Sequence, residues 1–307
     1  MRNQFFTFGE MLWDCLPSGR HAGGAPFNVA ADFAQLGVSA SLISAIGQDA
    51  LGDELLQVAT DKRIDTRFIS RARIDLPTGT VEAKLNAHGD ASYEIARPVA
   101  WDEIPVSSAL EPVTQSDGLV FGSLAGRSLY NRDQLHQLLA LKGPVKYLDV
   151  NLRPPFFERT HVLELARLVD VIKLNHEELA QLASWVGSGG EVNRSAMDLA
   201  TIEKDSAILA NATKTSRICI TRAEAGASFW DNGEFVSVPA PAVKVKDTVG
   251  AGDAFMAALV LGLTREIEPK TVLRVACQVG GFVASHFGAT PLFSEEIVRQ
   301  VDETLRK

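Results

Sequence analysis

The sequence predicts a doubly wound α/β fold, in which helices flank a mostly parallel sheet and a small β lid stands beside it. Apolar runs of strand length alternate with segments of helical spacing along most of the chain, the alternation typical of parallel βαβ units. Residues 78–97 break this alternation. There, two β-rich runs flank the turn signal His88-Gly89-Asp90, which predicts an antiparallel hairpin.

The 307 residues suit one large domain, and no internal repeat or low-complexity tract divides them. We expect a single domain over residues 1–307, with the lid formed from about 12–24 and 72–100. In doubly wound sheets, ligands bind at the carboxyl ends of the strands. The polar motifs described below follow predicted strands or precede a helix, so we expect them to gather at that edge.

The first half of the chain supplies the opening βα units. Residues 4–12 predict the first strand, and residues 27–37 predict a helix that ends at the C-cap candidate Gly37. The next strand and helix are predicted at 39–47 and 50–62.

The alternation resumes after the hairpin, where apolar runs again precede segments of helical spacing. The strands are predicted at residues 117–125, 145–151, 169–175, 217–221 and 226–230. The helices are predicted at residues 131–142, 156–168, 176–186, 252–263, 269–287 and 294–306.

Composition excludes several classes of partner. The net charge is −8 and no block of Lys or Arg stands out, which argues against nucleic acid or an anionic membrane surface as the main partner. No run of 18 apolar residues or signal-peptide pattern occurs, so no membrane partner is expected. The three cysteines show no CxxC spacing and fit reduced thiols. We expect a soluble, cytoplasmic protein.

The stretch DTVGAGDAF places two carboxylates on either side of a glycine-rich turn that opens a helix. A helix N-terminus offers unpaired N–H groups to an anion, and Gly250 and Gly252 let the backbone approach it. Asp253 would then lie beside that anion and accept a proton from an attacking hydroxyl. Alternatively, Asp247 and Asp253 merely favour the positive end of the helix.

Three other stretches each have a structural and a functional interpretation. In AGGAPFNVA, Asn28 either follows a tight turn or binds sugar hydroxyls. In KLNHEEL, Asn175 and Glu178 fit a capping box, and the same pair could organise water around Mg²⁺. In LDVNLRPPFF, Arg153 is either a solvated side chain or a donor to an anionic group.

Taken together, these stretches resemble the ribokinase-like (PfkB) family of carbohydrate kinases, and within it the bacterial fructokinases. GEMLWDCLPSG with GGAPFN is similar to the fructokinase opening, AIGQDALGDEL to the first family signature and DTVGAGDAF to the second. DVNLRPPFF and KLNHEE resemble intermediate motifs and arrive in the expected order. The resemblance runs nearly from end to end.

The resemblance implies an ATP-dependent sugar kinase that uses Mg²⁺, with Asp253 as the catalytic base. It implies an anion hole for the transferring phosphoryl group at Gly250, Ala251 and Gly252. It implies substrate contacts from Asp14, Gly24, Asn28, Arg97 and Arg153.

For the nucleotide, the resemblance implies contacts from Lys173, Asn175, Glu178, Thr221, Gly226 and Gly252. Glu178 would act on Mg²⁺ through water, and Asp247 would belong to a candidate K⁺ site near His286 and Gly288. One departure concerns the nucleotide loop, because the family pattern T-x-G-x-x-G reads TRAEAG here. Ala223 stands at the first glycine, and its methyl has a cost if that position needs a positive φ.

Fructose is the first substrate expected from the resemblance. 2-Keto-3-deoxygluconate stays open because Arg97 and Arg153 suit a carboxylate, whereas Asp14 disfavours it; a nucleoside is less favoured. A non-catalytic sugar-binding regulator is a further alternative, suggested by Ala223. A dinucleotide dehydrogenase ranks last because no GxGxxG follows the first strand. By resemblance alone, the lid sheet suggests a homodimer.

Overall fold

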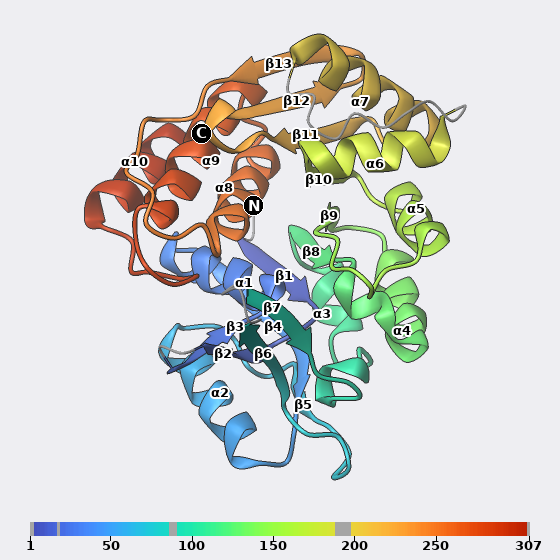
Figure 1. The fold of residues 1–307 in the computed structure, drawn as a ribbon, viewed down its shortest axis with the longest axis vertical. Coiled ribbons are helices and arrows are strands. Elements are labelled where there is room, and N and C mark those ends of the chain that lie inside the picture. Colours follow the sequence, from blue (N-terminus) through green and yellow to red (C-terminus); the bar gives the residue numbers. More distant parts are fainter. Residues whose placement is uncertain (1–2, 17–18, 86–90, 188–197, 306–307) are drawn as a thin grey trace.

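The computed structural model describes residues 3–16, 19–85, 91–187 and 198–305. Its centre is a nine-stranded sheet in the order β13-β12-β11-β10-β9-β8-β1-β4-β5 (Figure 1). The strands are β1 (Gln4–Phe8), β4 (Ser39–Ile46), β5 (Ile69–Arg71), β8 (Gly118–Gly122), β9 (Val145–Asp149), β10 (Val171–Asn175), β11 (Arg217–Thr221), β12 (Ala227–Asp231) and β13 (Glu234–Val238). In this sheet, β11, β10, β9, β8, β1, β4 and β5 pair in parallel in that order. Strands β12 and β13 add an antiparallel edge.

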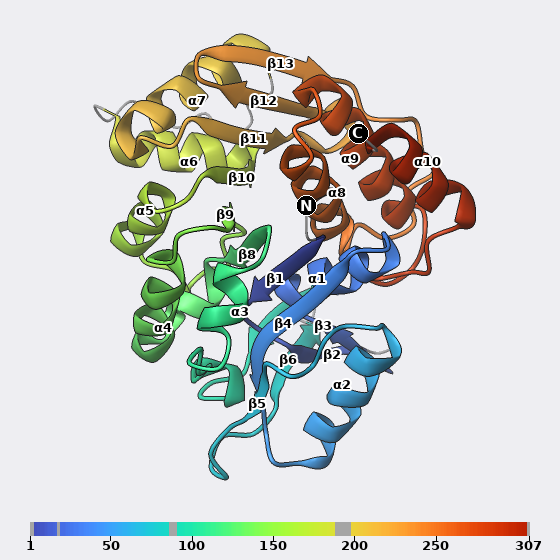
Figure 2. The ribbon, with the colours of Figure 1, turned by 180° about the vertical axis from the view of Figure 1, so that it is seen from behind.

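Helices cover both faces of this sheet, so the predicted doubly wound α/β class is confirmed (Figures 1 and 2). The helices are α1 (Ala25–Gln35), α2 (Ala50–Asp61), α3 (Leu110–Thr114), α4 (Leu129–Leu139), α5 (Arg159–Arg167), α6 (His176–Val186), α7 (Leu199–Thr213), α8 (Ala251–Thr264), α9 (Pro269–Ala284) and α10 (Glu295–Leu305). Helices α1, α8, α9 and α10 contribute to one apolar core, and α3 to α7 contribute to the other.

Strand β1 shows how the sequence builds these two cores. Successive side chains of a strand point to opposite faces of the sheet. Accordingly, Phe5 belongs to the core beneath α1 and α8, whereas Phe6 and Phe8 belong to the core on the opposite face. All three phenylalanines are buried, which is why this strand reads as a continuous apolar run rather than an alternating one.

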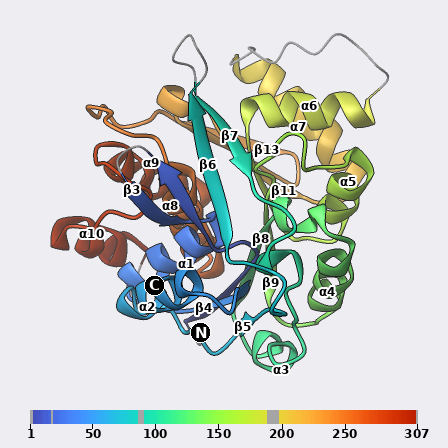
Figure 3. The same cartoon turned by 60° about the horizontal axis from the view of Figure 1, so that its bottom comes forward.

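A second sheet of four strands, in the order β3-β2-β6-β7, stands beside the central one (Figure 3). Its strands are β2 (Leu12–Leu16), β3 (Gly19–Gly23), β6 (Gly79–Leu85) and β7 (Ala91–Ile95). Strands β6 and β7 pair antiparallel, as the hairpin prediction requires. The predicted turn at His88-Gly89-Asp90 lies outside the described residues.

Several elements differ from the sequence-based expectation. The single strand expected at 4–12 is divided, because the chain leaves the central sheet after Phe8 and enters the second sheet at Leu12. Strands β5 and β13 and helix α7 were not predicted. The start of α7 does carry a local signal, since Asp198 caps the helix by accepting a hydrogen bond from the backbone N–H of Thr201 at 2.9 Å.

Among the described residues, no helix combines the length and apolar character needed to span a bilayer.

Candidate active site

The site lies where parallel strands end and α1 and α8 begin. Register places the ends of neighbouring strands level, with Lys173 of β10 beside Asp149 of β9 and Asn175 of β10 beside Thr221 of β11. Because the strands are parallel, residues far apart in the sequence meet at this one edge. Asp253 reaches the same edge from the first turn of α8.

The glycine turn before α8 sets the position of Asp253. Gly250 is the N-cap residue, with a left-handed φ of 79°. A Cβ atom there would lie 2.0 Å from the carbonyl oxygen of Ala289, so only glycine fits. The helix therefore begins with its first N–H groups and its positive end next to the Asp253 carboxylate.

Asp253 is a partly buried carboxyl group whose pKa is shifted toward neutrality. Burial, together with the charge of Asp149, raises its pKa to about 6. A hydrogen bond from Asn28 Nδ2 to Asp253 Oδ2, 2.8 Å long, and the charges of Lys173 and Arg153 oppose this rise. A carboxylate with a pKa near 6 is ionised at neutral pH and still basic enough to accept a hydroxyl proton.

A buried ion pair provides positive charge beside the anion site. Lys173 Nζ lies 3.0 Å from Asp149 Oδ1 and 2.8 Å from Asp149 Oδ2. Burial lowers the pKa of Lys173, but Asp149 outweighs this effect and the net change is upward, so the ammonium stays charged. A Cβ atom added to Gly252 would lie 3.3 Å from Lys173 Nζ, which places this charge next to the start of α8.

Acidic side chains line the opposite part of the site, around the start of α1. Asp14 lies in β2, and burial raises its pKa while His21 and Arg153 lower it. Glu10 accepts a hydrogen bond from the backbone N–H of Ala25 through Oε1 at 3.2 Å. Burial raises the pKa of Glu10 to about 7. Glu10 therefore holds the first residue of α1 in place and belongs to the same electrostatic cluster.

The two arginines expected at the substrate occupy different places. Arg153 is exposed, and its charge lowers the pKa values of Glu10, Asp14 and Asp253, so it lies within electrostatic range of all three acids. Arg97 follows β7, and its guanidinium carbon lies 5.6 Å from the centre of the Phe156 ring. It also lines a cavity of about 310 Å³ with Pro98, Asp102, Arg127 and Ser128.

Asn175 and Glu178 form a complete capping box at the start of α6. Asn175 Oδ1 accepts from the backbone N–H of Glu178 at 2.8 Å, and Glu178 Oε2 accepts from the backbone N–H of Asn175 at 2.9 Å. Glu178 Oε1 accepts a third bond, 2.8 Å long, from the backbone N–H of Leu152. Glu178 therefore ties α6 to the loop that carries Arg153, and each oxygen keeps one lone pair for water.

The predicted nucleotide loop follows β11. Thr221 ends that strand, and a short 3₁₀ turn from Ala223 to Ala225 leads to Gly226. Ala223 has a φ of 48°, so an alanine occupies a left-handed conformation that favours glycine. The turn is closed by a 2.8 Å hydrogen bond from the backbone N–H of Arg222 to the carbonyl oxygen of Gly226.

Asp247 shapes the turn ahead of α8. Its Oδ1 accepts from the backbone N–H of Val249 at 3.0 Å, and its Oδ2 accepts from the backbone N–H of Gly288 at 3.0 Å. It thus joins the two loops that the resemblance associates with K⁺. Within the described ranges, no group of three or more His, Cys, Asp or Glu side chains is arranged to hold a metal ion.

The family of the chain follows from comparison with known sequences. The pattern described as pfkB family carbohydrate kinase matches residues 17–296. The chain belongs to the pfkB family of carbohydrate kinases. This membership makes it an ATP-dependent carbohydrate kinase, a phosphotransferase with an alcohol group as acceptor.

Relatives and solved structures agree with this assignment. A sugar kinase of Pyrococcus horikoshii is 30% identical over 255 residues, covering 80% of this pfkB kinase and 74% of the relative. The fructokinase of Klebsiella pneumoniae is 28% identical over 292 residues, covering 90% and 89% of the two chains. The crystal structure of the P. horikoshii protein has a TM-score of 0.82 at 26% identity and covers 98% of this chain and 99% of its own. An ATP-bound fructokinase of Xylella fastidiosa shares the fold, with a TM-score of 0.82, 21% identity and full coverage of both chains.

Three acidic residues near Asp253 were missed by the sequence analysis. Asp149 lies within the DVNLRPPFF motif, and Glu10 lies within GEMLWD, but neither was assigned a role. Asp32 lies in the helix that follows GGAPFN and reads as an ordinary polar residue. Their motifs offered a signal for the first two, whereas only burial distinguishes Asp32.

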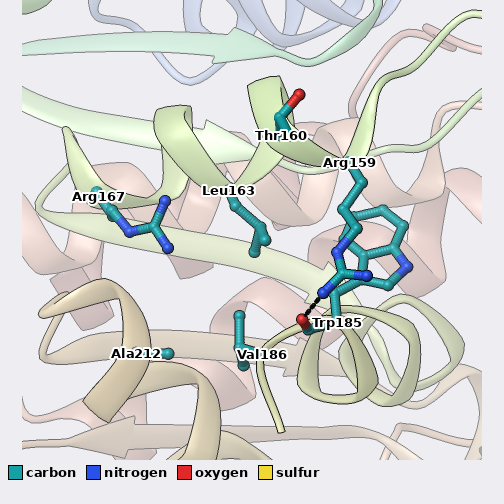
Figure 4. Close-up of a pocket in the computed structure, with 7 residues that line it drawn as sticks. All are labelled: Arg159, Thr160, Leu163, Arg167, Trp185, Val186 and Ala212. Atoms are coloured by element: carbon teal, nitrogen blue, oxygen red, sulfur yellow. Dashed lines mark hydrogen bonds between the residues drawn. The ribbon is translucent and has the colours of Figure 1, made fainter. Parts of the chain in front are cut away.

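A cavity of the pfkB kinase lies away from this site. It measures about 600 Å³, lies between α5, α6 and α7, and is shown in Figure 4. Arg159 reaches across it and donates a hydrogen bond to the carbonyl oxygen of Trp185. No residue predicted for substrate, nucleotide or metal lines it among those described.

Proposed function

We propose that this pfkB kinase transfers the γ-phosphoryl group of ATP to a primary hydroxyl of a small sugar, with fructose as the preferred substrate. The observation that carries the proposal is the environment of Asp253. It is partly buried in the first turn of α8, accepts a hydrogen bond from Asn28 and lies within the electrostatic reach of Lys173 and Arg153. These are the features required of a base that acts next to a phosphoryl group.

In the proposed reaction, the sugar hydroxyl oxygen forms a bond to the γ-phosphorus, and the bond from that phosphorus to the β–γ bridging oxygen breaks. Asp253 takes the hydroxyl proton, and ADP leaves with the bridging oxygen. The N–H groups at Gly250, Ala251 and Gly252 stabilise the charge on the transferring group, and the Lys173 ammonium adds to this stabilisation. Asp14, Gly24 and Asn28 hold the other sugar hydroxyls.

Mg²⁺ is the proposed partner of ATP. The free lone pairs of Glu178 point to water-mediated contact, which suits an ion that keeps most of its waters. The ion would shield the phosphate charges and orient them for transfer. Asn175, Thr221 and Gly226 are proposed to contact the nucleotide. An Escherichia coli protein of this fold is described with ATP and Mg²⁺.

A monovalent ion is a further proposal. Asp247 and the loop around Gly288 are already joined by a hydrogen bond, so a K⁺ ion would bind between parts of the chain that are held together. A fructokinase variant of Vibrio cholerae is described in a form with fructose, ADP and potassium ion. This supports a K⁺ site in the proposed kinase.

2-Keto-3-deoxygluconate is the second candidate substrate, and the position of Arg97 favours it. Arg97 and Arg127 both line the cavity of about 310 Å³. Arg127 is already paired with Asp102, so among the described residues that line this cavity Arg97 is the cation proposed to meet a carboxylate. Fructose is preferred because several relatives that align along most of the chain are named fructokinase.

We also propose that the second sheet, with the segments around it, is a lid that closes over the sugar within a single domain. Closure would exclude water and limit hydrolysis of ATP. Pairing of such sheets between two subunits would give a homodimer. ATP and a small sugar in the cytoplasm are the expected partners.

The deciding experiment is coupled ADP release with Mg²⁺–ATP and a panel of fructose, 2-keto-3-deoxygluconate, ribose, glucose and adenosine, with and without K⁺. We expect the highest kcat/KM on fructose. A preference for the keto-acid would retain the mechanism and change the substrate. Binding of a sugar without turnover on any compound would favour the regulatory alternative instead.

The Asp253→Asn variant tests the base directly. We expect kcat to fall roughly a hundredfold or more while the sugar still binds, because only proton acceptance is lost. Asp61→Asn, an exposed substitution of the same chemistry on α2, is the matched control and should behave like the wild type. Near-normal turnover by Asp253→Asn would contradict the proposed role.

A further inference from the structure

Asp32 is a buried acid in α1 that the proposed reaction does not use. Its side chain is fully shielded from solvent. Oδ1 accepts a hydrogen bond from Gln35 Nε2 at 3.3 Å, whereas Oδ2 is buried with no hydrogen-bond partner among the residues that the structure describes. An ionised carboxylate in this position would be costly, because burial strongly disfavours an unpaired charge.

A second oxygen in the same situation lies one helical turn away. Asn28 precedes Asp32 by four residues, so the two side chains share a face of α1. Asn28 Nδ2 donates to Asp253 Oδ2 at 2.8 Å, and Asn28 Oδ1 is buried with no partner among the described residues. Two buried acceptor oxygens on one helix face, each without a donor among the described residues, are both satisfied if one of them carries a proton and donates it to the other.

The charges around Asp32 favour the protonated form. Burial raises its pKa well above the usual range and the charge of Asp253 raises it further, while Lys62 and Gln35 lower it. Lys62 follows α2 and donates to the carbonyl oxygen of Thr290 at 3.2 Å. Strands β1, β4 and β8, against which α1 packs, carry no titratable side chain.

We propose that Asp32 is a positioning residue for the catalytic base: it carries a proton on Oδ2, donates it to Asn28 Oδ1 and thereby fixes the orientation of the Asn28 amide. The amide then presents the donor Nδ2 to Asp253, whose ionised carboxylate has acceptors but no donor. The proposal rests on the assignment of Asp253 as the base. It adds an internal hydrogen-bond chain from Asp32 through Asn28 to Asp253.

This chain has a consequence for pH dependence. When Asp32 loses its proton, Oδ2 no longer donates and repels Asn28 Oδ1, so the amide is released from its orientation. The ionised Asp32 also places a second negative charge near Asp253. Activity should therefore fall at alkaline pH as Asp32 ionises.

Kinetics of two variants test the proposal. Asp32→Asn keeps a neutral donor, so we expect kcat within about twofold of the wild type and loss of the alkaline decline. Asp32→Ala removes the donor, and we expect kcat to fall roughly tenfold or more because the base is less well oriented. Wild-type kcat and an unchanged pH profile in Asp32→Ala, or equal losses in both variants, would overturn the proposal. Asp61→Asn is the control for a general effect of losing a carboxylate.

An infrared measurement separates this proposal from the proposed function. The difference spectrum between wild type and Asp32→Asn at neutral pH, without sugar or ATP, should contain the carbonyl band of a protonated carboxyl group. A carboxylate band in its place would disprove the Asp32 proton whatever the enzyme's activity. Conversely, full activity of Asp253→Asn would refute the base assignment while the infrared band still reported Asp32.

Discussion

At the residue scale, the site concentrates acids that folding makes less acidic. Burial raises the pKa values of Glu10, Asp14, Asp32, Glu178 and Asp253. Each of these groups favours its protonated form more in the folded chain than in the unfolded one. Arg153 and Lys173 offset part of this effect but leave the net direction unchanged at Asp253. Poorly solvated carboxyl groups are typical of functional sites, which supports the role proposed for this one.

The pKa of Asp253, about 6, predicts the acid side of the pH profile. Only the ionised form accepts a proton, so kcat/KM should rise with pH and level off above about pH 6. Initial rates of ADP release at low sugar concentration measure this directly. A rise centred near the ordinary pKa of an aspartate would show that burial does not control the base.

The raised pKa of Asp253 also makes the free energy of unfolding depend on pH. Between pH 3.8, the ordinary pKa of an aspartate, and about pH 6, Asp253 keeps a proton in the folded state that it has lost in the unfolded state. The free energy of unfolding therefore decreases as pH rises through this window, by roughly 1.4 kcal/mol per pH unit. Asp253→Asn should consequently be more stable than wild type at pH 7, by up to about 3 kcal/mol. Urea unfolding at pH 4 and pH 7 tests this, and equal stabilities at both values would contradict it.

At the scale of elements, the ends of helices and strands build the site. Gly250 places the start of α8, the capping box of Asn175 and Glu178 places the start of α6, and Glu10 holds the start of α1. All three are helix N-termini, whose first backbone N–H groups can bind an anion. The loop after β11 differs, because a residue with a side chain, Ala223, has a left-handed backbone there.

Ala223→Gly should relieve that strain. A left-handed conformation costs a residue with a Cβ roughly 1–2 kcal/mol, part of which is offset by the greater freedom of glycine in the unfolded chain. We expect a net gain of about 0.5–1 kcal/mol in the free energy of unfolding and a lower KM for ATP. Lys214→Gly, at the left-handed C-cap of α7, is the matched control. It should stabilise the protein similarly without changing the KM for ATP; an unchanged KM in both would show that the methyl does not affect nucleotide binding.

At the scale of the whole molecule, two sheets with different roles share one chain. The central sheet aligns Asp149, Lys173 and Asn175 at its edge, and the second sheet carries Asp14 toward the same place. The chain passes between the sheets four times: after β1, after β3, before β6 and after β7. Movement of the second sheet relative to the central one would therefore open and close the sugar side of the site.

Closure predicts a change of shape on sugar binding. The radius of gyration of a compact chain of this length is roughly 19 Å, and we expect it to fall by a few tenths of an ångström when fructose is added to the Asp253→Asn variant. Small-angle scattering measures this without turnover. Adenosine serves as the control ligand, and an unchanged radius at saturating fructose would argue against a lid.

Local sequence patterns predicted some features of this protein, and others depend on contacts between residues far apart in the chain. The sequence by itself determined the fold class, the order of the motifs and the capping box of Asn175 and Glu178, because strand and helix periodicity and helix capping involve residues close together in the chain. The contact of Asn28 with Asp253 joins residues 225 positions apart, and that of Asp149 with Lys173 joins residues 24 apart. Only the tertiary structure decided those contacts and the burial of Asp32, because strand order and packing, which local patterns do not encode, bring these groups together and remove them from water.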